Sequence, residues 1–271
     1  MGCQIRRILF FFFIFVAVYL NPYILSESDK KGDAVDLPQI LKKTAEYCER
    51  LDRISLHFIC NEEINERIYY QFYFRSFFKE NSYIYDYQLI RKDNEVEERR
   101  VFLEENGEPK NEENAELKTK RFWHKYVIFG PVGLLGESQQ KRHDYLVKKE
   151  EKYKGDKCYV IEVVPKPDTK TDGLFGKAWV RQNDCSVIKI EWNQQSMGNI
   201  DRIEEKTSKL GAKPKITFTS EYAFEKNGIR FPSRYTVKEE FVRRVRVKIS
   251  ETTVVYTDYK FFIVETEVKI K

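Results

Sequence analysis

Histidine, glycine and proline are scarce in this sequence, which has 3, 12 and 8 of them among 271 residues. Three histidines leave little room for a metal site, and none of them stands at metal-ligand spacing to another histidine or to a pair of cysteines. The low glycine and proline content excludes collagen-like chains and chains dominated by flexible linkers. We therefore expect a folded protein that holds no metal and no other cofactor.

Catalytic motifs are also missing. The sequence contains no G-x-S-x-G nucleophile elbow and no H-E-x-x-H metalloprotease helix. The glycine-rich stretch over residues 130–136 lacks the Lys-Ser/Thr pair that would hold a nucleotide phosphate. These absences predict a protein that is not an enzyme. A secreted hydrolase whose catalytic residues are dispersed along the sequence remains an alternative.

Aromatic and charged residues, by contrast, are abundant, at 15% and 34% of the chain. Disordered chains lack aromatic side chains because they have nothing to bury, so we expect this chain to fold. The formal net charge of +5 arises from both signs mixed throughout the chain. That mixture indicates solubility and argues against a nucleic-acid partner.

The N-terminus has the pattern of a signal peptide. Arg6 and Arg7 precede an uncharged apolar run of 13 residues, 8–20, which is shorter than the stretch of about 20 that spans a membrane. Ser26 and Ser28 supply the small residues before a cleavage point. We predict a signal peptide over residues 1–28, and one exported domain over residues 29–271. The alternative is an uncleaved anchor.

Helical periodicity is confined to the start of the mature chain. Apolar residues recur at spacings of three or four over residues 36–53, which predicts one amphipathic helix. Asp36 followed by Pro38 and Gln39 is typical of a helix start.

A period of two replaces the helical period in the rest of the chain. It predicts long strands, and Asn227-Gly228 is a strong hairpin signal. Because no strand–helix–strand rhythm is present, we expect an antiparallel sheet with one solvated face. Residues 104–120 carry few large apolar groups and predict a solvated loop or a weak helix. The predicted strands cover residues 83–89, 96–103, 158–164, 174–180, 186–192, 216–224, 245–249, 252–256 and 261–270.

Two stretches allow two interpretations each. The apolar segment 122–135 is either a buried connection in the core or a mobile flap over a pocket for an apolar ligand. The basic stretch 243–248 could contact phosphates or anionic lipid heads, but its strict alternation favours a strand with a solvated face.

Export would permit disulfide bonds. Cys48 lies on the apolar face of the predicted helix and Cys60 on the following strand, so we predict a disulfide between them. Cys158 and Cys185 begin strands that should flank the strand over residues 174–180. Two strand spacings are about 9.5 Å, beyond the roughly 7 Å limit between Cα atoms of a disulfide, so we expect these two to stay unpaired.

The stretch GKAWVRQNDCSVIKIEW at residues 176–192 resembles paired strands of the exported bacterial outer-membrane lipoprotein-sorting (LolA-like) superfamily. There a Trp-bearing strand turns through a polar Asn/Asp loop and returns as a strand of alternating apolar residues. The resemblance implies a mainly β fold with α: a single, strongly curved antiparallel sheet, an incomplete β-barrel, with an N-terminal helix and covering helix or loop segments. This chain is longer than the simplest members, and no residue matches the arginine that some members use at the cavity.

The resemblance further implies a periplasmic carrier that holds a lipid or lipoprotein acyl chain without covalent chemistry, contacts membranes transiently and has cell-envelope proteins as further partners. The alternative is a non-enzymatic envelope interaction or sensor module whose hollow is filled by its own side chains. Large apolar side chains predict the ligand-binding surface, and the candidates are Trp123, Tyr126, Phe129, Leu134, Leu135, Trp179 and Trp192.

Overall fold

A computed structural model describes residues 35–54, 57–72, 75–92, 95–167, 174–197 and 200–262. The described residues from Asp36 onward form one compact unit. The predicted signal peptide over residues 1–28 and most of the predicted strand 261–270 lie outside the described residues.

The predicted N-terminal helix is confirmed as α1 (Leu37–Ile54). Its first turn is capped by Asp36, whose Oδ1 accepts a hydrogen bond from the Gln39 amide at 3.1 Å. The apolar side of α1 packs mainly against α2 (Gly130–Leu135), α3 (Glu137–Gln140) and β11 (Ile229–Phe231).

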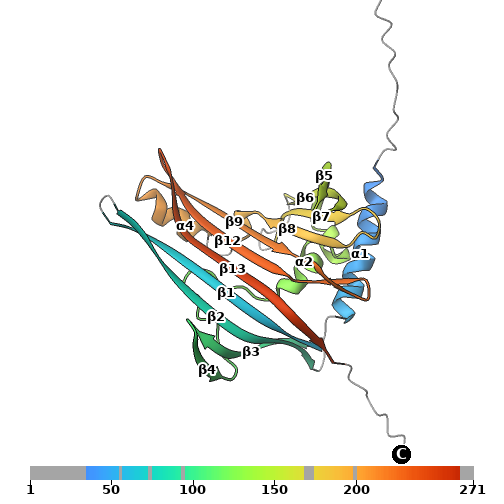
Figure 1. Ribbon diagram of the computed structural model, residues 1–271. Helices are drawn as coiled ribbons and strands as arrows, with labels where there is room; N and C mark the ends of the chain where they lie inside the picture. Colours follow the sequence, from blue (N-terminus) through green and yellow to red (C-terminus); the bar gives the residue numbers. More distant parts are fainter. Residues whose placement is uncertain are drawn as a thin grey trace, which may run out of the picture. The chain divides into compact units, whose positions relative to one another are not determined.

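The described residues form one large antiparallel sheet of eleven strands, in the order β4-β3-β2-β1-β13-β12-β9-β8-β7-β6-β5 (Figure 1). Because β4 and β5 are both edge strands, the sheet is not closed into a barrel. The predicted mainly β fold with an N-terminal helix is therefore confirmed. The strands are β1 (His57–Phe72), β2 (Arg75–Lys92), β3 (Glu95–Glu105), β4 (Glu108–Glu112), β5 (His143–Tyr153), β6 (Asp156–Pro165), β7 (Gly176–Arg181), β8 (Val187–Trp192), β9 (Lys213–Glu221), β12 (Arg234–Val242) and β13 (Arg246–Phe261).

Shorter elements complete the described part of the chain. A 3-10 turn, η1 (Val127–Phe129), leads into α2, and η2 (Gln194–Ser196) precedes α4 (Ile200–Ser208). The predicted turn at Asn227-Gly228 is confirmed, with φ of 54° and 74°, but it joins β10 (Phe224–Lys226) to β11 in a separate two-stranded sheet.

One face of the sheet carries the core. Along β2 every second side chain from Asn81 to Leu89 is buried, as the period of two predicts. We call this the covered face, because α2 and residues 117–129 lie against it. A smaller cluster on the opposite side comprises Cys158, Val160, Trp179 and Ile188.

Two local predictions are corrected. Residues 104–120 are not simply a loop or weak helix, because Asn106-Gly107 forms a tight turn with positive φ and β4 pairs back onto β3. The second correction concerns the expected strand over residues 216–224, which ends at Glu221.

The predicted disulfide between Cys48 and Cys60 is wrong. All four described cysteines are free and buried. Helix α1 packs mainly on α2, α3 and β11, and the Cys48 thiol donates to the Pro131 carbonyl at 3.3 Å instead of meeting β1. Burial raises the pKa of the Cys48 and Cys60 thiols, so both are poor nucleophiles. The predicted meander is confirmed, because β6, β7 and β8 are consecutive neighbours.

Candidate functional site

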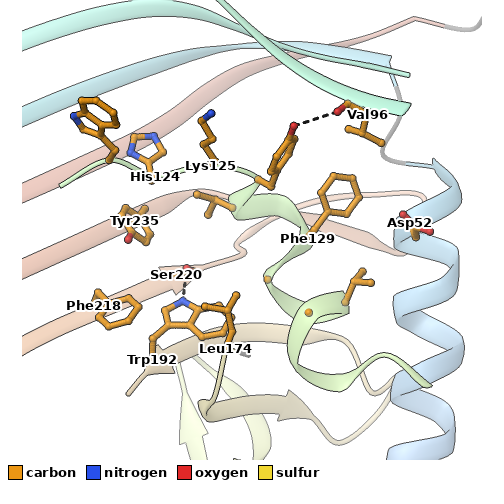
Figure 2. A pocket seen from close by; sticks show the side chains of 16 residues that line it. Asp52, Val96, His124, Lys125, Phe129, Leu174, Trp192, Phe218, Ser220 and Tyr235 are labelled. Carbon is orange, nitrogen blue, oxygen red and sulfur yellow. Dashed lines mark hydrogen bonds between the residues drawn. The ribbon is translucent and has the colours of Figure 1, made fainter. Parts of the chain in front are cut away.

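An apolar pocket of about 660 Å³ lies between the covered face and the start of α2 (Figure 2). Side chains from β8, β9 and β12 form its floor, and residues 123–133 form the opposite wall. Figure 2 shows Phe129, Trp192 and Phe218 arranged around this space. The lining residues are Asp52, Val96, Trp123, His124, Lys125, Tyr126, Val127, Phe129, Gly130, Val132, Gly133, Leu174, Trp192, Phe218, Ser220 and Tyr235.

The floor is rigid because its aromatic residues are fixed by specific contacts. The Trp192 ring stacks on Phe218 with centroids 6.4 Å apart, and its Nε1 donates to Ser220 Oγ at 3.0 Å. This single polar group of Trp192 is therefore satisfied, which leaves the ring's apolar surface for the pocket.

The wall is anchored to the sheet at two points. Tyr126 has a left-handed backbone with φ of 51°, which turns the chain into η1, and its hydroxyl donates to the Val96 carbonyl at 3.2 Å. Gly130 approaches the sheet so closely that an added Cβ would overlap the Tyr222 hydroxyl and lie 3.1 Å from the Trp192 ring. Only glycine fits at this contact.

A buried ion pair lies beside the pocket. Arg100 on β3 makes a two-pronged contact with Glu62 on β1, at 2.6 and 3.2 Å, and His124 Nε2 lies 2.8 Å from the same carboxylate. Burial would raise the pKa of Glu62, but the nearby Arg100 and His124 outweigh burial and lower it from 4.5 to about 2. Glu62 is therefore ionised at neutral pH.

Two further buried carboxylates hold residues 117–129, which we call the covering segment. Glu66 accepts from the amides of Lys120 and Arg121 at 2.8 and 3.0 Å. The Arg121 guanidinium contacts Glu239 on β12 at 3.0 and 2.6 Å. Together with Glu62, these carboxylates fix the covering segment to strands β1 and β12, and so position the wall of the pocket.

The pocket presents few polar groups, and the buried Arg100 beside it is neutralised by Glu62. Among the described residues, no group of three or more His, Cys, Asp or Glu side chains is placed to hold a metal ion.

Comparisons with known proteins find likeness in structure only. No family model matches the chain, and no curated protein matches its sequence. A LolA superfamily protein from Nitrosomonas europaea shares 16% identity at a TM-score of 0.41, over 88% of this chain and 99% of that one. A putative outer membrane lipoprotein-sorting protein domain from Vibrio parahaemolyticus shares 10% identity at 0.46, over 84% and 94%. The chain is similar to LolA superfamily structures.

A weaker likeness is to the MucA/MucB complex of Pseudomonas aeruginosa, with 9% identity and a TM-score of 0.23, over 83% of this chain and 99% of that one. The predicted resemblance to the lipoprotein-sorting superfamily is thus confirmed as a likeness. No helix formed by the described residues has the length and apolar character needed to cross a membrane.

The structure brings together four of the seven predicted binding residues. Trp123, Tyr126, Phe129 and Trp192 all line the pocket. Trp123 is the most exposed of them, at 70%, because its ring lies at the outer rim.

The other three lie elsewhere. Leu134 and Leu135 are both 0% exposed and belong to the main core, because α2 turns them away from the pocket. Trp179 lies on the opposite side of the sheet, in the smaller cluster with Ile188. On β7 its neighbour Ala178 has the core-facing position instead.

Several residues that line the pocket were not among the predicted binding residues. Phe218 and Ser220 are alternate residues of β9, and Tyr235 lies opposite Ser220 on β12. The period of two identifies which residues share a face, and it could have grouped Phe218 with Ser220. It does not show that the covering segment leaves space above them.

Proposed function

We propose that this chain is an exported, periplasmic lipid- or lipoprotein-binding carrier that holds an acyl chain in the pocket and performs no covalent chemistry. The observation that carries the proposal is the pocket of about 660 Å³ lined mainly by apolar and aromatic side chains. Its volume falls within the range of about 300–1,000 Å³ that is typical of small-molecule sites.

The character of the lining supports an apolar ligand. The aromatic rings of Phe129, Trp192 and Phe218 offer broad apolar surface and lose little rotamer entropy on binding. Each buried methylene contributes about 0.8 kcal/mol, so an acyl chain could bind tightly without a charged contact. The buried cation beside the pocket, Arg100, is paired with Glu62 and is not needed for this mode of binding.

The alternative function is an envelope interaction module with a self-filled hollow. The segment expected to fill the hollow does so only in part: Leu134 and Leu135 enter the core, whereas Phe129 and Val132 stop at the pocket wall. The remaining volume favours the carrier over the self-filled module.

Filling the pocket from Gly133 tests the proposal. A Cβ at Gly133 would have only Leu174 Cδ1 nearby, at 3.8 Å, so a larger side chain enters open space. Gly133→Phe is expected to weaken binding of cis-parinaric acid, measured by its fluorescence, at least about tenfold, because displacing two methylenes of the ligand costs about 1.6 kcal/mol.

Gly133→Ala is the matched control. It adds only the Cβ and replaces a helical glycine, so it should leave binding unchanged and stabilise α2 by up to about 1 kcal/mol. Trp179→Phe, on the far side of the sheet, should also bind as the parent does. Equal affinity of the parent and Gly133→Phe for the probe would contradict the carrier function.

Processing is a separate prediction. The short apolar run and the Ser26-x-Ser28 pair predict a mature chain that begins near Asp29. N-terminal sequencing of the protein from the cell-envelope fraction should give this start. Recovery of Met1 or Gly2 from a membrane pellet would favour the uncleaved anchor.

A further inference from the structure

The far end of the β1–β2 hairpin carries four aromatic rings in two cross-strand pairs, and three of these rings are exposed. Tyr70 and Phe77 stack with centroids 5.3 Å apart, and Tyr69 and Phe78 lie 5.9 Å apart. Tyr70, Phe77 and Phe78 are 42%, 56% and 54% exposed. Single exposed apolar residues are ordinary, whereas a contiguous group of large rings marks an interaction surface.

The two pairs lie on opposite faces of the hairpin. Side chains alternate along a strand, so Tyr70 and Phe77 share the covered face while Tyr69 and Phe78 share the other. A protein groove would cover one face of a ribbon. Surroundings that enclose the whole tip, as a lipid bilayer does, are needed to cover both faces of the hairpin.

Basic residues adjoin these rings. Strand β13 pairs with β1, and Lys248 lies over the Tyr69 ring with its Nζ 5.8 Å from the centroid. The turn between β12 and β13 carries Arg243 and Arg244, which are exposed beside Val245, at 69% exposed. Figure 1 shows the β1–β2 and β12–β13 hairpins extending to the same side of the sheet.

The charge of this region is predominantly positive. Acidic neighbours are present, but Glu80 pairs with Arg67 and Glu240 pairs with Arg246. Among the described residues, no ion pair is formed by Arg243, Arg244 or Lys248. The hairpin-tip surface is the set Tyr69, Tyr70, Phe77, Phe78, Lys79, Arg243, Arg244, Val245 and Lys248.

We propose that the hairpin-tip surface docks the protein on a lipid bilayer that has anionic headgroups. The rings enter the interface between headgroups and acyl chains, where Tyr and other aromatic residues are favoured, and the basic side chains contact lipid phosphates. Each of the two signals alone binds membranes weakly, and together they give stable but reversible docking. The surface is separate from the pocket, so this proposal does not depend on the carrier function.

Vesicle co-sedimentation tests the proposal. The protein should bind vesicles of phosphatidylcholine mixed with phosphatidylglycerol more tightly than pure phosphatidylcholine, and added salt should weaken this binding. Arg243→Gln with Arg244→Gln should lower the affinity for anionic vesicles about 30-fold, because each basic residue near such a surface contributes about 1 kcal/mol. Phe77→Ser with Phe78→Ser should lower it for both vesicle types.

Matched variants separate docking from general charge or hydrophobicity. Lys152→Gln with Lys157→Gln removes two exposed cations elsewhere, and Leu146→Ser removes an apolar side chain that is 55% exposed. Both should sediment as the parent does, as should Gly133→Phe. In Phe77→Trp, tryptophan emission should shift to shorter wavelength when anionic vesicles are added, because the ring leaves water.

Three results would overturn the proposal: no preference for anionic vesicles, unchanged sedimentation of the Arg243/Arg244 variant, or sedimentation of Phe77→Trp with no emission shift. Size-exclusion chromatography without lipid could give a fourth result of this kind. If it shows a dimer that dissociates in the Phe77→Ser, Phe78→Ser double variant, the surface contacts a second copy of the chain and not a membrane. Circular dichroism should confirm that every variant keeps its sheet.

Discussion

Replacing Leu134 and Leu135 together with aspartate is expected to prevent the protein from folding. Both side chains are completely buried in the main core, under α1 and against the covered face. Loss of a buried leucine side chain already costs about 2–5 kcal/mol, and an unpaired buried carboxylate costs more. The combined cost of the two changes is comparable with the whole free energy of unfolding of a typical domain, which is roughly 5–15 kcal/mol. Circular dichroism of the purified variant should show no cooperative thermal transition.

The opposite result would indicate a mobile flap. A folded double-aspartate variant with a transition near that of the parent would place the segment outside the core. Leu134→Met with Leu135→Met is the control, because it keeps side-chain volume and should cost less than about 1.5 kcal/mol per site. Neither leucine lines the pocket, so this experiment tests the core, and the Gly133 variants test the ligand site.

Arg100→Leu is expected to destabilise the protein by about 3–5 kcal/mol at neutral pH. It leaves the fully buried Glu62 carboxylate without its main cation, and the cost of an uncompensated buried charge is of this size. The covering segment depends on the same carboxylate through His124. Urea unfolding followed by circular dichroism measures the change in the free energy of unfolding.

Two comparisons distinguish the charge effect from a packing effect. The double variant Glu62→Leu with Arg100→Leu removes both charges and should be clearly more stable than Arg100→Leu alone. The second comparison uses pH. In the parent, the pKa of Glu62 is lowered from 4.5 to about 2, so the stability from this pair is present above pH 4.5 and is lost as the pH falls toward 2.

In Arg100→Leu the contribution of Glu62 to the pH dependence of stability should reverse its sign. Burial then dominates and raises the pKa of Glu62, so acidification neutralises the carboxylate and reduces the loss relative to the parent. A difference between parent and variant that stays constant from neutral pH to pH 4 would indicate that Arg100 acts through packing alone.

Periodicity predicted the local elements well. Helix α1 follows from apolar spacings of three and four and from Asp36 at its start, and β2 follows from strict alternation between Asn81 and Leu89. These properties depend on backbone geometry that repeats every few residues. The same local reasoning identified the turn at Asn227-Gly228, because positive φ at both positions suits these residues.

The site required knowledge of contacts between residues far apart in the chain. Alternation cannot say which face of β7 meets the core. Trp179 was therefore predicted to line the hollow, although its neighbour Ala178 has the core-facing position and Trp179 lies on the opposite side. Nor can it say that α1 packs on α2, which separates Cys48 from Cys60.

The pocket itself arises from three buried carboxylates on β1 and β12 that hold the covering segment above the sheet. Their partners come from β3 and from residues 120–124, which no sequence spacing connects to them. Helix and strand patterns are set by neighbouring residues, whereas a pocket is the space that remains after distant elements pack and pair their buried charges. The residue pattern therefore determined the helix, the strands and the apolar character of residues 122–135, and tertiary packing decided which of those residues became core and which became pocket wall.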